Sequence, residues 1–170
     1  MRARGTSRGA VCGLFLLLVM VTPLAAQSLA DLQARFERET SGVQKAKQIG
    51  KLGDAQFEEA WRAGKAGDYN AVGLTLERYR DNVRAAVDAL KKQHPDAEKQ
   101  SNGYRQLEMY VRKGIREVDD TLLVSPEGYK PPLQIVRQDL IKMDDELLKM
   151  LFPRRPLNQR PAVPPAEKQP

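Results

Sequence analysis

Cysteine and histidine each occur only once in the 170 residues of this chain, as Cys12 and His94. Cys12 lies in an apolar stretch near the N-terminus, so a product that has lost this stretch holds no thiol. This excludes disulfides, cysteine zinc sites and a cysteine nucleophile. A single imidazole forms neither a catalytic triad nor a metal cluster, and we assign His94 to the end of a helix, where positive charge is favourable. We therefore predict no catalytic residue, no metal ion and no cofactor.

Long hydrophobic runs are missing apart from residues 10–21. Three arginines and no acidic residue precede this run, and Leu24-Ala25-Ala26 follows it. A basic start, an apolar centre and small residues at the end are typical of a secretory signal peptide. The run has about 12 residues, whereas a membrane-spanning helix needs roughly 20, which argues against the alternative of a permanent anchor. We predict that residues 1–26 are a bacterial signal peptide cleaved after Ala26, and that the product is periplasmic or secreted, with no transmembrane segment after processing.

The central part of the chain lacks an excess of either charge. The whole chain has a net charge of +6, from 28 basic and 22 acidic residues. Three basic residues precede residue 27, and four lie beyond residue 152 beside one acidic residue, so residues 27–152 carry 21 of each sign. A nucleic-acid-binding domain needs a basic face to neutralise phosphates. We therefore predict no nucleic-acid partner.

Proline is nearly absent from the interior of the chain. Only four prolines occur between Gln27 and Phe152, and each lies between periodic segments. Apolar residues within these segments recur every three or four positions, which is typical of amphipathic helices. The pattern predicts helices over 28–49, 54–64, 68–94, 95–124 and 133–151, with breaks at Gly50, at Gly53 and, more weakly, at Asn102-Gly103.

No segment alternates apolar and polar residues with period two, so the sequence predicts no β-sheet. One-sided apolar stripes must be buried against each other, and short connections make successive helices antiparallel neighbours. The long stripes also follow the spacing of coiled coils. Residues 27–152 are therefore predicted to form an all-α, up-and-down antiparallel helical bundle of four long helices plus one short one.

The helical pattern stops beyond Phe152. Six of the last 18 residues are proline and almost none is apolar, which predicts a disordered or polyproline-like tail over residues 153–170. Arg154 and Arg155 are candidates for a weak contact with an anionic envelope surface, because a basic residue near such a surface contributes about 1 kcal/mol. The alternative is that the tail only increases solubility.

Two acidic clusters, Asp119-Asp120 and Asp144-Asp145-Glu146, favour either ion pairing or, as an alternative, a cation sensor or small enzyme. A chain reversal near residues 127–128 places Asp144 and Asp145 level with Arg112 and Lys113, and Asp119 and Asp120 level with Arg137 and Gln138, because both helices rise equally per residue. We therefore predict a solvated, ion-paired face. Residues four apart predict further pairs: Glu108 with Arg112, Lys113 with Glu117, Arg116 with Asp120, Lys142 with Glu146, and Asp145 with Lys149.

Aromatic residues are scarce, and four of the ten lie between residues 57 and 79. Phe57, Trp61, Tyr69 and Tyr79 are predicted to be core residues, since large aromatics dominate buried area. The alternative is an aromatic pocket, in which Trp61 and Tyr69 are candidate interaction residues. The stretch 57–69 resembles the turn between the two helices of a tetratricopeptide repeat, mainly through Gly67-Asp68-Tyr69. That resemblance covers one repeat and implies a peptide-binding module, but no second copy follows about 34 residues later.

Together these patterns predict an exported helical bundle with a non-enzymatic binding or structural role. Its expected partner is another protein or a second copy of the same chain, which would associate through the long apolar stripes. A tetratricopeptide-like peptide-binding module and a cation sensor or small enzyme remain the alternatives.

Overall fold

The computed structural model describes residues 28–153 of the chain. The predicted signal peptide, the tail beyond Pro153 and the candidate residues Arg154 and Arg155 lie outside the described residues. Within these limits no helix combines the length and apolar character needed to cross a membrane.

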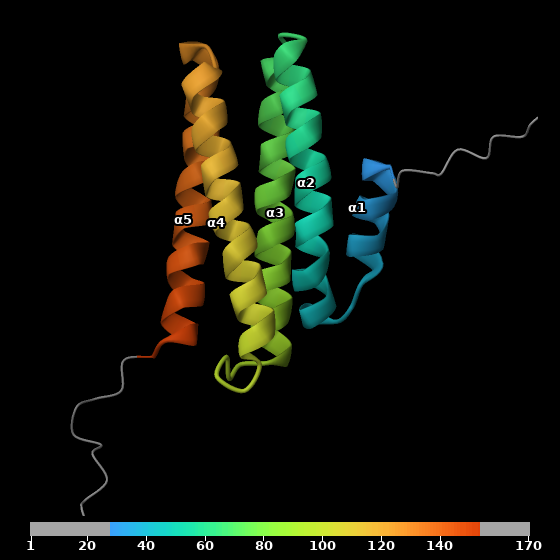
Figure 1. Cartoon of the computed structure of the whole chain (residues 1–170), viewed down its shortest axis with the longest axis vertical. Coiled ribbons are helices and arrows are strands. Elements are labelled where there is room, and N and C mark those ends of the chain that lie inside the picture. Colours follow the sequence, from blue (N-terminus) through green and yellow to red (C-terminus); the bar gives the residue numbers. More distant parts are fainter. Residues whose placement is uncertain (1–27, 154–170) are drawn as a thin grey trace, which may run out of the picture.

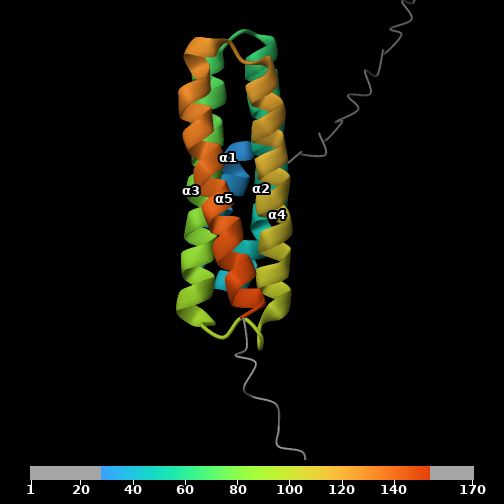
Figure 2. The same ribbon diagram turned by 90° about the vertical axis from the view of Figure 1, so that its left-hand side faces the viewer.

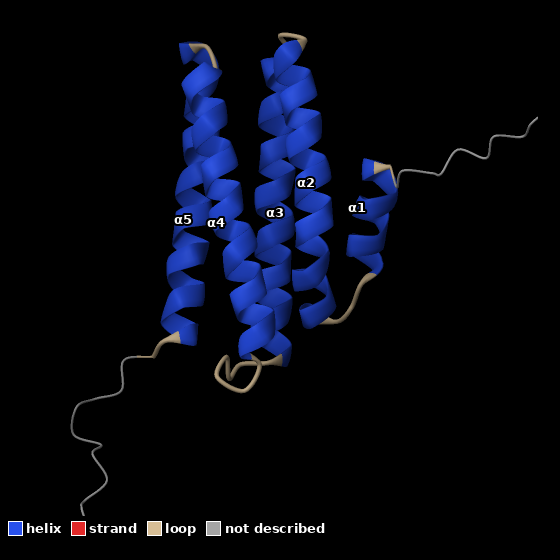
Figure 3. Cartoon of the chain, in the orientation of Figure 1, coloured by secondary structure: helices blue, strands red, loops and turns tan. Residues whose placement is uncertain are grey.

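Residues 28–153 fold into α-helices without any strand, which confirms the all-α prediction (Figure 3). A short 3₁₀ turn, Glu127–Tyr129, precedes the last helix. The helices are α1 (Leu29–Arg38), α2 (Gly42–Lys65), α3 (Tyr69–Gln93), α4 (Ser101–Val124) and α5 (Lys130–Leu151). Four of them are long and one is short, as predicted, but the short one is α1 and not the segment around Trp61.

The four long helices form a bundle of two antiparallel hairpins, α2–α3 and α4–α5 (Figure 1). The hairpins stack so that α2 lies beside α4 and α3 beside α5, as the side view shows (Figure 2). The chain direction alternates from each long helix to the next. Although α3 and α4 follow each other in the sequence, they lie diagonally across the bundle. The connection of residues 94–100 therefore crosses from one hairpin to the other.

The first break in the helical pattern lies at residues 39–41 and not at the predicted glycines. Ser41 caps α2 by accepting a hydrogen bond from the backbone N–H of Gln44 at 3.4 Å. Gly50 and Gly53 lie inside α2, where a Cβ on either would come within 2.6 Å of Tyr110 and 2.8 Å of Tyr79, respectively. These glycines let two aromatic rings approach the helix backbone closely, which is a packing role that the prediction mistook for helix termination.

The helix α4 also starts later than predicted. Residues 94–100 form a connection, in which the Asp96 carboxylate accepts hydrogen bonds from the backbone N–H groups of Glu98 and Lys99. The helix α4 begins at Ser101 and runs through Asn102-Gly103 without interruption. Pro95 therefore lies more than one helical turn before α4 instead of in its first turn. The pair Asn102-Gly103 lies in that first turn.

The core follows the predicted apolar stripes. Its largest fully buried side chains include Tyr79, Tyr104, Leu107 and Leu140. Both tyrosines satisfy their hydroxyl groups on backbone carbonyls, since Tyr79 donates to Tyr110 at 2.8 Å and Tyr104 donates to His94 at 2.7 Å. A buried hydroxyl needs such a partner, so these bonds fix the two rings and link α3 and the 94–100 connection to α4.

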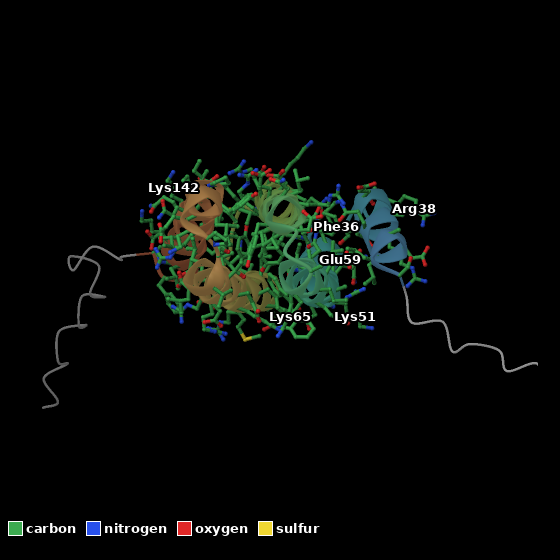
Figure 4. All side chains as sticks on the ribbon, turned by 90° about the horizontal axis from the view of Figure 1, so that it is seen from above. Phe36, Arg38, Lys51, Glu59, Lys65 and Lys142 are labelled. Atoms are coloured by element: carbon green, nitrogen blue, oxygen red, sulfur yellow. The ribbon has the colours of Figure 1, made fainter. Side chains whose placement is uncertain are left out.

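The short helix α1 packs on the outside of the bundle, against α2 (Figure 1). Phe36 points from α1 toward the bundle and is 2% exposed, whereas Arg38 points away (Figure 4). Gln33 and Asn82 of α3 exchange two amide hydrogen bonds of 3.1 and 2.9 Å. This reciprocal pair fixes the height at which α1 lies along the bundle.

Candidate functional site

The two hairpins diverge at the end of the bundle that holds the α2–α3 turn and the α4–α5 connection (Figure 1). A groove of about 430 Å³ opens there between α2, α3 and α4. We call it the Trp61 groove. Its lining residues are Phe57, Ala60, Trp61, Gly64, Lys65, Tyr69, Val72, Leu76, Glu117, Asp120, Thr121, Val124 and Ser125.

The rim of the Trp61 groove is built by the tight turn between α2 and α3. Gly67 has a φ of 77°, a left-handed conformation that glycine adopts without strain. Asp68 then caps α3, its carboxylate accepting a hydrogen bond of 3.0 Å from the backbone N–H of Ala71. Because the chain reverses within these residues, Trp61 and Lys65 at the end of α2 lie near Tyr69 at the start of α3.

Trp61 is the largest side chain of the groove, and 64% of its surface is exposed. The Lys65 ammonium lies 5.2 Å from the centre of its ring. Phe57 and Tyr79 are buried and their ring centres are 4.6 Å apart, so the core prediction is correct for both. It is wrong for Trp61, whose ring lies at the open side of the groove, where the hairpins diverge.

Tyr69, the second candidate interaction residue, is half-buried at the mouth of the groove. Its ring centre lies 5.4 Å from that of Tyr129, in the turn before α5. The structure thus brings Trp61 and Tyr69 to one groove, from two helices. The floor below them is apolar and buried, made of Phe57, Val72 and Leu76.

One wall of the groove is acidic. Glu117 and Asp120 project from α4, and among residues 28–153 neither forms an ion pair. The predicted partner of Glu117, Lys113, instead bonds Asp54 of α2 at 2.7 Å. Glu117 also acts on the core beside it, because burial first, and then the charges of Asp54 and Glu117, raise the pKa of Tyr79.

The hydroxyl groups in this wall are already engaged. Thr121 donates to the backbone carbonyl of Glu117 at 2.7 Å, and Ser125 donates to that of Thr121 at 2.8 Å. A hydroxyl nucleophile needs a base that takes its proton, whereas both of these protons are directed at carbonyl oxygens of the helix. Neither hydroxyl is therefore hydrogen-bonded to a side-chain base in residues 28–153.

The predicted pairing of acidic with basic residues across the α4–α5 hairpin is confirmed for Asp119 and Asp144. Arg137 bonds Asp119, and Arg112 lies 3.7 Å from Asp144 and 2.6 Å from Glu108. The other four pairs predicted within single helices are not formed in residues 28–153, and Lys113, Lys142 and Glu146 have other partners. Lys91 of α3 forms an ion pair with Glu146, and Lys142 forms one with Asp139. No group of three or more metal-binding side chains suited to a metal ion occurs in the part of the chain that the structure describes.

Asp144 provides a pH-dependent test of this paired face. Desolvation by burial raises the pKa of its carboxyl above 3.8, against the opposing charge of Arg112, and one carboxylate oxygen has no hydrogen-bond partner in residues 28–153. A raised pKa means that the folded state binds the proton more tightly, so this group reduces stability as pH rises through its pKa. We expect Asp144→Asn to raise the free energy of unfolding at pH 7 by less than about 1 kcal/mol.

That gain should shrink as the pH falls and disappear well below pH 3.8, where the carboxyl is neutral in both states. Urea unfolding of the wild type and the variant across this pH range measures it, with the exposed neighbour in Asp145→Asn as the control. A gain at pH 7 that persists unchanged in acid would contradict the role assigned to burial of the charge.

His94 lies where the sequence predicted, at the end of α3, and its backbone N–H donates to the carbonyl of Leu90 at 2.8 Å. The α2–α3 hairpin has the tight Gly67-Asp68-Tyr69 turn on which the tetratricopeptide resemblance rested. Within residues 28–153 this hairpin pairs with α4–α5 to close a bundle, and its helices have 24 and 25 residues. A two-helix repeat has about 34 residues in total, so the geometry does not favour a concave stack of repeats.

Comparison of the chain with protein-family models, with curated proteins and with solved structures finds no match.

Proposed function

We propose that this chain is an exported helical-bundle protein that acts by binding a polypeptide segment in the Trp61 groove. Trp61, 64% exposed over an apolar floor, is the observation that carries the proposal. Aromatic side chains that stand exposed beside an apolar groove are the usual centres of protein interfaces. The signal-like residues 1–26 support a periplasmic or secreted location.

The polar groups of the groove fit a binding role. Glu117 and Asp120 on one wall offer carboxylates that form no ion pair among residues 28–153, and Lys65 lies on the α2 side of the groove. Such groups set the orientation and specificity of a ligand that an apolar floor holds. The cation-sensor alternative gains less support, because Asp119 and Asp144 face Arg137 and Arg112.

Site-specific photocross-linking tests the proposal. A benzophenone amino acid placed at Trp61 is expected to give adducts with one defined polypeptide segment when the full chain is produced in its own cells. Leu74 of α3 is a matched control, because it is 66% exposed but does not line the groove. Identical adducts at positions 61 and 74 would remove the support for the groove. Mass spectrometry of the same material tests export, which predicts a product that starts at Gln27.

A further inference from the structure

Resting on the proposed function, we propose that the occupant of the Trp61 groove is this chain's own C-terminal segment, residues 160–165. Their sequence is Arg-Pro-Ala-Val-Pro-Pro. Three features carry this assignment: the aromatic character of the groove, the charge on its wall, and the length of chain that follows α5.

The first feature is the match between a proline-rich segment and an aromatic groove. Extended proline-rich segments dock into grooves lined by aromatic rings, with little loss of entropy on binding. Trp61 and Tyr69 supply exposed and half-exposed rings, and Phe57 supplies the buried floor between them. Three prolines and Val163 in the proposed segment provide the apolar side chains that such a surface accommodates.

The second feature is charge complementarity. Residues 153–170 contain four basic residues and one acidic residue. The groove wall holds Glu117 and Asp120, which lack ion-pair partners among residues 28–153. An arginine forms strong bidentate hydrogen bonds with a carboxylate, so Arg160 is the side chain expected to bind this wall.

The third feature is length. The helix α5 ends at Leu151, at the opposite end of the bundle from the groove (Figure 1). The pairs Arg112–Asp144 and Arg137–Asp119 fix the register of the hairpin and place Glu117 level with residue 139 or 140. The axial distance from Leu151 to this level is then about 17 Å, at 1.5 Å per residue.

Crossing the width of α4 adds a lateral step of about 10 Å, which makes the whole path roughly 20 Å. Residues 153–159 span about 22 Å at the 3.1 Å per residue of an extended proline-rich chain. Arg160 is therefore the first tail residue that arrives at Glu117. The following residues continue along the groove toward Val124, which lies about 10 Å further along the helix axis.

Attachment within one molecule is favoured over exchange between molecules. A linker whose length matches the span gives an effective concentration in the millimolar range. A tail from a second copy competes only when the protein itself approaches that concentration. The segment therefore covers the groove of its own chain, and any other polypeptide must displace it.

Fluorescence tests this arrangement directly, because Trp61 is the only tryptophan. The chain from Gln27 to Pro170 is compared with its double variant Arg160→Glu/Val163→Asp. Loss of docking should shift the emission of Trp61 to longer wavelength and raise its acrylamide quenching constant roughly twofold, because a covered aromatic anchor becomes solvent-exposed. In the wild type, about 1 M salt should produce a similar change by screening the arginine.

The matched control is Arg154→Glu/Leu157→Asp, which replaces an arginine by glutamate and an aliphatic residue by aspartate at the same spacing, six residues earlier. It lies in the linker and should leave the emission unchanged. Equal spectra for all three proteins would overturn the proposal, as would a wild-type spectrum that changes between about 1 and about 100 µM, far below the effective concentration within one chain. If position 61 cross-links to a different polypeptide while the tail variants have no effect, this inference fails and the proposed function stands.

Discussion

Replacing Gly114 with alanine is expected to lower the free energy of unfolding by about 2 kcal/mol, because overpacking costs up to roughly 3 and alanine restores about 1 through helix propensity. A Cβ at position 114 would lie 2.3 Å from Cε1 of Tyr79 and 2.6 Å from its hydroxyl oxygen. Tyr79 has no room to move, since its ring is 1% exposed and its hydroxyl is bound to the Tyr110 carbonyl. The new methyl group must therefore push α3 and α4 apart.

The matched control is Gly73→Ala in α3. A Cβ at position 73 meets no atom of the described residues within 4 Å, so this variant should gain about 0.5–1 kcal/mol. Urea denaturation of both variants measures the two changes in opposite directions. Equal stability of the two variants would show that the ring of Tyr79 is not held against Gly114.

The helices that the sequence predicted best are those whose pattern is local. The apolar stripe of α3 is regular along the whole helix and predicts its extent. Asp68 caps the start of this helix, as its position indicates. The register of the α4–α5 hairpin was also predictable, because equal rise per residue fixes which residues face each other. The ion pair of Arg137 with Asp119 agrees with this register to within one residue.

The errors arose where a distant residue decides the local structure. Gly50 and Gly53 continue a helix because Tyr110 and Tyr79, far along the chain, pack against them. A glycine carries no local sign of such a ring. The true break was visible, since Ser41 and Gln44 have the spacing of a capping box, and this signal was outweighed by the apolar periodicity on either side of it.

The candidate site was predictable only in part. Trp61 and Tyr69 were identified from their residue types and neighbouring turn. The acidic wall was missed because Glu117 and Asp120 were assigned partners four residues away in their own helix. The Lys113 ammonium instead forms an ion pair of 2.7 Å with the Asp54 carboxylate of α2. Which carboxylates remain unpaired depends on how the hairpins stack, and the sequence of one helix does not contain that information.

Gln56→Met is expected to raise the free energy of unfolding by about 1–3 kcal/mol, the penalty of burying polar groups without hydrogen bonds. Gln56 is 0% exposed, and neither amide atom has a hydrogen-bond partner in residues 28–153. Methionine has nearly the same length and adapts its shape to a packed core. Guanidinium unfolding of the two proteins measures the gain, and a loss of stability would show that the amide is satisfied in solution.

Gln56 occupies the central stripe of α2, between Gly53 and Ala60, where an apolar residue would be more stable. A polar residue at such a position fixes the register and partner choice of helices in some coiled coils, at the expense of stability. If Gln56 has this role, Gln56→Met gains stability but no longer adopts a single packing of its helices. The variant should then show broader amide resonances and a smaller slope of the free energy of unfolding against denaturant concentration. If the resonances stay sharp, the glutamine is not needed for a single packing of the two hairpins, and the divergence that opens the Trp61 groove follows from the remaining core alone.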